Sequence, residues 1–167
     1  NCADALNDNQ SGGLFQSIRS LCQSFESSIE ILYQSGKENL ISWDFFFNTA
    51  MCYFEYIDTL LSDASILNNI SSPDNELIKA LQRCIIMFEK TLNFMNNILV
   101  NNVDDESINK DSVSWVCTES YRMISSIYET LYSNELIDIF DNFTKDFIEK
   151  IDSIVLKLFQ EKLSNDI

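Results

Sequence analysis

Hydrophobic positions recur at spacings of three and four through most of the chain, with polar positions between them. This spacing places apolar side chains on one face of an α-helix. After a polar leader at residues 1–13, the pattern predicts five long helices that begin near residues 14, 39, 73, 112 and 134. The second helix is expected at 39–68. We therefore predict an all-α, single-domain bundle of antiparallel helices over residues 14–167.

Glycine, proline and capping residues mark the expected helix ends. Gly36 is expected to end the first helix, because glycine readily adopts the left-handed conformation that follows a helix. Ser72 is expected to cap the third helix, with Pro73 at its first position. Asp111 or Ser112 is expected to cap the fourth helix.

One short stretch of the second predicted helix is unusually rich in aromatic side chains, namely Trp43, Phe45, Phe46, Phe47, Tyr53, Phe54 and Tyr56. A helix that is apolar on all sides is normally enclosed by its neighbours. The second helix is therefore predicted to lie at the centre of the bundle. Two other interpretations stay open: an exposed face that binds a partner protein, and an internal cavity for an apolar ligand. That cavity would lie among Phe45, Phe46, Phe47, Phe54, Phe88 and Phe94.

Composition supports the helical class and narrows the range of partners. Three glycines and one proline allow few tight turns, which disfavours hairpins. The net charge of −15, from 26 acidic and 11 basic side chains, repels phosphate backbones, so we expect no binding of nucleic acid. Charged residues also interrupt every apolar stretch, so no membrane insertion is expected.

Several kinds of chemistry lack the residues that they need. The chain has no histidine, which excludes histidine-dependent triads and histidine-ligated metal centres. Its cysteines form no C-x-x-C pair, and no glycine-rich phosphate-binding motif occurs. We expect no enzymatic activity, no cofactor and no metal site.

The first residues suggest export, and export bears on the state of the cysteines. The chain begins Asn-Cys-Ala-Asp, as after removal of a signal peptide. Asn69 lies in an Asn-Ile-Ser glycosylation signal within a predicted turn. Four cysteines fall one per predicted helix, either as disulfides between helices or as buried free thiols: Cys22, Cys52, Cys84 and Cys117. Cys2 in the leader is left over, for an intermolecular bond or as a thiol.

These observations favour a secreted, non-enzymatic interaction protein that binds a partner protein through a helix face. The expected contact residues are aromatic: Trp43, Phe46, Phe47, Tyr53, Tyr56 and Trp115. A carrier of a small hydrophobic ligand in the bundle core is one alternative. A self-assembling structural secretion, which would form homo-oligomers, is the other.

Overall fold

The computed structural model describes residues 17–63, 75–100, 108–133, 141 and 144–156, and the regular elements within these residues are all helical. They are α1 (Ile18–Gln34), the short 3₁₀ turn η2 (Glu38–Leu40), α2 (Trp43–Leu61), α4 (Glu76–Val100), α5 (Lys110–Ser133) and a helical segment at 144–156. The predicted all-α bundle is confirmed. The expectations for the leader at 1–13, for Cys2 and for Asn69 concern residues outside the described ones.

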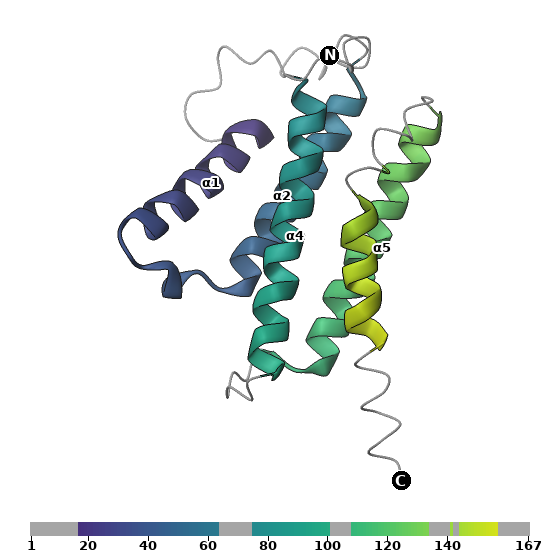
Figure 1. Ribbon diagram of the computed structural model, residues 1–167. Helices are drawn as coiled ribbons and strands as arrows, with labels where there is room; N and C mark the ends of the chain where they lie inside the picture. Colours follow the sequence, from purple (N-terminus) through teal and green to yellow (C-terminus); the bar gives the residue numbers. More distant parts are fainter. Residues whose placement is uncertain (1–16, 64–74, 101–107, 134–140, 142–143, 157–167) are drawn as a thin grey trace, which may run out of the picture.

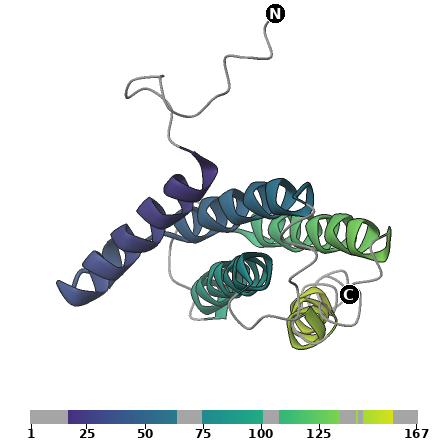
Figure 2. The ribbon, with the colours of Figure 1, turned by 90° about the horizontal axis from the view of Figure 1, so that it is seen from above.

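Four of the helices form the body of the bundle. α2, α4, α5 and the segment 144–156 run alternately in opposite directions, and α1 crosses the outer side of α2 (Figure 1). Seen from above, α1 projects diagonally from this group (Figure 2). α2 packs mainly against α4 and also contacts α1. The central position predicted for the second helix is thus confirmed.

The first helix ends as its sequence predicts. Gly36 has a φ of 65°, which is the left-handed conformation that favours glycine. The backbone N–H of Lys37 donates to the carbonyl of Leu32 at 2.8 Å. This hydrogen bond satisfies one of the carbonyl groups that lack a partner within the last turn of α1. At the other end, the Ser17 hydroxyl accepts from the backbone N–H of Ser20 at 3.2 Å.

The start of α4 differs from the prediction. The helix begins at Glu76, and the Oδ1 atom of Asn75 caps it by accepting from the backbone N–H of Leu77 at 2.9 Å. The expected cap Ser72 and the expected first residue Pro73 lie outside the described residues. Asparagine and serine cap with similar strength, so local sequence gives no basis for choosing between two nearby candidates.

The N-terminal cap of α5 also differs from the predicted Asp111 or Ser112. Asn109 caps this helix, because its Oδ1 accepts from the backbone N–H of Ser112 at 2.8 Å. The Ser112 hydroxyl in turn accepts from the backbone N–H of Asn109 at 2.8 Å. This reciprocal pair has the arrangement of a capping box, in which the predicted residue supplies the second half. Asp111 lies inside the first turn, where its charge suits the positive end of the helix dipole.

Aromatic rings hold the core together. α2 begins at Trp43 and ends at Leu61, inside its predicted limits, and its rings are buried or partly buried. The Phe47 ring meets the Phe88 ring of α4 edge to face, with 5.9 Å between centroids. Phe88 also stacks on Phe147 of the segment 144–156 at 6.2 Å. These contacts connect three helices through fully packed rings.

No helix in the described part of the chain is long and apolar enough to cross a membrane.

Candidate functional site

Two tryptophans and a phenylalanine from two helices meet at the surface of the bundle. The ring centroids of Trp43 and Phe47 are 6.4 Å apart, and those of Phe47 and Trp115 are 5.1 Å apart. Phe47 is buried and Trp43 is partly buried, whereas 49% of Trp115 is exposed. We call these three residues the tryptophan surface. In this surface, the partly exposed Trp115 ring packs on Phe47, which is itself buried in the core.

The helical repeat explains this arrangement. Trp43 and Phe47 are four residues apart and so lie on one face of α2. On α5, Val113 and Val116 are buried, and Trp115 lies between them at the edge of the apolar stripe. Its ring therefore reaches Phe47 with one side while the other side stays in water.

Acidic side chains flank the tryptophan surface. Asp44 follows Trp43 in the first turn of α2, and Asp111 lies one turn before Trp115 on α5; both are exposed. Within the described residues, Asp111 has no hydrogen-bond or ion-pair partner. Asp44 accepts a hydrogen bond from the Ser42 hydroxyl and keeps its negative charge. An exposed ring beside carboxylates suits a cationic group, which gains from both the ring face and the charge.

The six predicted contact residues separate into different places. Trp43, Phe47 and Trp115 meet in the tryptophan surface. Phe46 lies elsewhere, with the Lys90 ammonium 5.4 Å from its ring centroid. The remaining two, Tyr53 and Tyr56, line a cleft on the other side of α2.

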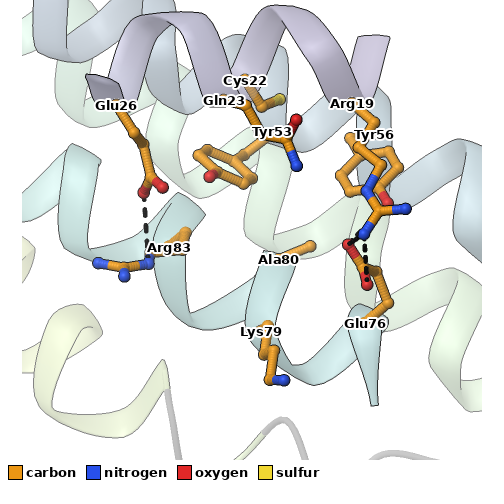
Figure 3. A pocket seen from close by; sticks show the side chains of 10 residues that line it. All are labelled: Arg19, Cys22, Gln23, Glu26, Tyr53, Tyr56, Glu76, Lys79, Ala80 and Arg83. Carbon is orange, nitrogen blue, oxygen red and sulfur yellow. Dashed lines mark hydrogen bonds and ion pairs between the residues drawn. The ribbon is translucent and has the colours of Figure 1, made fainter. Parts of the chain in front are cut away.

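This cleft, of about 190 Å³, opens between α1, α2 and α4 (Figure 3). Two ion pairs bridge α1 and α4 beside it. Arg19 Nη2 lies 3.1 Å from Glu76 Oε1, and Arg83 Nε lies 3.3 Å from Glu26 Oε1. The second pair lies seven residues after the first on both helices, so α1 and α4 run parallel here. The arginine comes first on α1 and the glutamate comes first on α4. We call this site the α1–α4 cleft; its lining residues are Arg19, Cys22, Gln23, Glu26, Tyr53, Tyr56, Glu76, Lys79, Ala80 and Arg83.

The two tyrosines of the cleft lie beside the carboxylates of the ion pairs. Tyr56 donates a hydrogen bond to Glu76 Oε1 at 3.0 Å. Tyr53 lies beside Glu26, whose negative charge acts on its hydroxyl group. Burial, followed by the hydrogen bond to Glu76, raises the pKa of Tyr56 to about 12. Burial and the charge of Glu26 also raise the pKa of Tyr53. Both phenols are therefore neutral hydrogen-bond donors at physiological pH.

The four cysteines among the described residues are free thiols, which agrees with the second of the two alternatives left open by the sequence and not with disulfide bonds between these helices. Cys22, Cys84 and Cys117 are buried, and Cys52 is partly buried. The Cys84 thiol donates to the carbonyl of Ala50 at 3.5 Å. Their burial agrees with the predicted positions on or beside the apolar faces of the helices. The apolar pattern shows on which face of its helix a cysteine lies. It does not show which residue of a neighbouring helix lies opposite that cysteine.

Burial also sets the ionisation of these thiols. It raises the pKa of Cys22 to about 12 and that of Cys117 to about 11, and it raises the pKa of Cys84 as well. A thiol that stays protonated is a poor nucleophile and a poor metal ligand. The described residues include no group of three or more acidic or cysteine side chains placed to hold a metal ion.

These raised pKa values predict that stability decreases at alkaline pH. The unfolded chain releases thiol and phenol protons from about pH 8.5 upward, whereas the folded chain retains them to higher pH. In that interval the unfolded state binds fewer protons, so the free energy of unfolding falls as pH rises. Urea unfolding under reducing conditions between pH 7 and 10.5 is the measurement. Replacing Cys22 by alanine should flatten the pH dependence, and a flat profile in the unmodified protein would contradict the assignment.

Four of the six aromatic residues proposed for a carrier's cavity pack against other rings or line very little space. Phe47 and Phe88 fill the core, and Phe45 packs edge-on against Phe25 with 5.2 Å between centroids. Phe54 borders a recess of about 10 Å³, which holds no more than about one water molecule. The described rings therefore act mainly as core.

Sequence reasoning missed the α1–α4 cleft because its basic residues are far apart in the chain. Two of the three arginines of this acidic protein line it, together with Lys79. One signal was present: Arg19 and Glu26 repeat the seven-residue spacing of Glu76 and Arg83 with the charges exchanged. That match is consistent with the two ion pairs that the structure shows between parallel helices.

Comparison with protein-family models, with curated proteins and with solved structures finds no match to this chain. The fold and the sites thus define the class directly: an acidic helical-bundle protein with an exposed tryptophan surface and a separate charged cleft.

Proposed function

We propose that this chain is an exported, non-enzymatic interaction protein whose tryptophan surface binds a partner protein with basic side chains. The observation that supports it is the convergence of Trp43, Phe47 and Trp115 from two helices, with half of Trp115 left in water. Tryptophan is among the residues that contribute most to protein interfaces, particularly where neighbouring side chains hold it rigidly. Phe47 provides that support here.

Charge supports a basic partner. The chain has a net charge of −15, and Asp44 and Asp111 flank the tryptophan surface. Complementary charge speeds the encounter of two proteins and disfavours acidic competitors. Arginine and lysine side chains also bind the face of a tryptophan ring. Leu40, three residues before Trp43 in the chain, is also an exposed apolar side chain.

Site-specific photo-crosslinking tests this proposal. Trp115 is replaced by the photoreactive residue p-benzoylphenylalanine, and the protein is irradiated in the fluid or extract in which it naturally occurs. A matched variant carries the same residue in place of Ile86, an exposed apolar side chain of α4. We expect the probe at 115, and not the one at 86, to capture one defined protein with basic residues at the crosslinked peptide.

The other outcomes are equally informative. Capture of a second copy of this chain would favour the self-assembling alternative. Equal capture at positions 115 and 86, or none at either, would contradict binding through the tryptophan surface. Both tryptophans of the chain belong to this surface, so their intrinsic fluorescence then reports docking directly. A captured partner should shift the emission to shorter wavelength and protect it from iodide quenching.

A further inference from the structure

On one face of α5, an exposed aromatic ring lies between two carboxylates. Asp111, Trp115 and Glu119 follow one another at intervals of four residues, so each lies one turn from the next on the same face of the helix. Asp111 and Trp115 are exposed, and Glu119 is partly buried. The two carboxylates are thus equally far from Trp115 in the sequence, one before it and one after it.

Only the second of these carboxylates is already paired. Arg122 Nη2 lies 2.7 Å from Glu119 Oε2, and Arg122 Nε donates to the same oxygen at 3.0 Å. Among the described residues, Asp111 has no hydrogen-bond or ion-pair partner. Asp111 and Arg122 are about 16 Å apart along the helix axis, so Arg122 cannot pair with both carboxylates. Asp111 is therefore the acceptor that remains available beside the ring.

The direction of helical side chains also favours the Asp111 side of the ring. Long side chains in α-helices generally lean towards the N-terminus, over the preceding turn. The turn before Trp115 contains Asp111, and the turn after it contains Glu119. A group stacked on the Trp115 ring is therefore expected within reach of the Asp111 carboxylate.

A guanidinium group fits this ring and carboxylate better than an ammonium group does. The guanidinium is planar, so its face stacks on an indole while the N–H groups at its edge donate to a carboxylate. An ammonium group is compact and strongly hydrated, and it has neither the flat face nor the paired donors. The indole N–H of Trp115 has no acceptor among the described residues, so it remains a donor for a backbone carbonyl. This combination suits an arginine within a polypeptide.

We propose that the tryptophan surface recognises arginine in preference to lysine, with the guanidinium stacked on Trp115 and hydrogen-bonded to Asp111. This inference rests on the proposed function, since it names the side chain by which the partner protein docks. It also goes further than charge. The net charge of −15 attracts both basic side chains, so a preference between them reports the local geometry.

A displayed library of random dodecapeptides tests this preference without the natural partner. The library is selected against the full chain and, in parallel, against Trp115→Ala, whose folding is checked by circular dichroism. Peptides retained by both proteins bind elsewhere on the acidic surface and are discarded. We expect the peptides retained only by the unmodified protein to be enriched in arginine and not in lysine.

Exchanges in a selected peptide then separate shape from charge. The peptide is synthesised with arginine, lysine or citrulline at the enriched position. Lysine keeps the charge without the planar group, whereas citrulline keeps the planar group without the charge. Each exchange should weaken binding about fivefold, the usual size of one favourable contact at an exposed site. Tryptophan fluorescence measures the affinities, and the protein itself stays unchanged in this comparison.

Two charge-matched variants assign the preference to one carboxylate. Asp111→Asn and Glu119→Gln each remove one negative charge, one turn from Trp115. Asp111→Asn should reduce the loss on exchange of arginine for citrulline to within about twofold, because the charge that the guanidinium met is gone. Glu119→Gln should leave that loss at about fivefold, because Glu119 is paired with Arg122.

The outcomes distinguish this inference from the proposed function. Equal affinities for the arginine and lysine peptides would overturn arginine recognition and leave a surface that accepts any basic partner. The same citrulline loss in both carboxylate variants would overturn the role of Asp111 and therefore the inference as well. If every selected peptide binds Trp115→Ala as tightly as the unmodified protein, the tryptophan surface itself fails, and both proposals fail with it.

Discussion

Replacement of Phe88 by alanine should lower the free energy of unfolding by about 3–5 kcal/mol, the usual cost of removing a fully buried aromatic ring. Phe88 is 2% exposed and contacts rings on both sides. Its neighbours are Phe47 on α2, at 5.9 Å, and Phe147 on the segment 144–156, at 6.2 Å. The substitution therefore leaves a cavity where three helices meet, and the surrounding rings can fill it only partly.

Urea unfolding followed by circular dichroism measures this loss. Phe94→Ala is the matched control, because Phe94 is the same residue type on the same helix but only partly buried. Phe94→Ala should lower the free energy of unfolding by about half as much as Phe88→Ala or less, because Phe94 buries a smaller apolar area. If Phe88→Ala does not fold, Phe88→Leu leaves a smaller cavity. Its loss of stability should still exceed that of Phe94→Leu. Equal losses at positions 88 and 94 would contradict the packing described above.

Replacement of Trp115 by alanine should weaken binding to the partner captured by photo-crosslinking about 30-fold or more. That factor corresponds to about 2 kcal/mol, the threshold for an interface hot spot. The physical reason is that Trp115 combines a large apolar ring with rigid support from Phe47, at 5.1 Å between centroids. A ring already fixed in place loses little conformational freedom on binding. Isothermal titration calorimetry with the captured partner measures the change.

Two controls separate this effect from general destabilisation. Ile86→Ala removes an exposed apolar side chain of α4 and should leave the affinity within about twofold. Trp115→Phe retains a ring and should recover part of the affinity lost in the alanine variant. Asp111→Asn should mainly slow association and reduce its dependence on salt. Normal affinity in a folded Trp115→Ala variant would remove the tryptophan surface from the proposed function.

The helices of this protein were predictable because their signal is local. Spacings of three and four reflect 3.6 residues per turn, and each helix contains enough turns to show them. Gly36 also marked the end of α1 correctly, because its φ of 65° is rarely adopted by other residues. Caps were less predictable. Asn75 and Asn109 each lie beside other good capping residues, and local energies differ too little to select one.

The candidate sites were only partly predictable. Trp43 and Trp115 were selected as aromatic anchors, but nothing in the sequence placed them on a common surface with Phe47. The α1–α4 cleft was not anticipated at all, because Arg19 and Arg83 belong to different helices. The relative height of two helices depends on how all their side chains interlock, and this information is not present in either helix alone.

The sequence alone determined that this chain is helical and strongly acidic and that it lacks histidine chemistry, since composition and local periodicity are sufficient for these properties. Only the tertiary structure decided that Phe47 is enclosed while half of Trp115 remains in water. It also decided that two distant arginines and two tyrosines share a cleft. The physical reason is that periodicity fixes which residues share a face of a helix. Packing between helices then fixes what that face meets.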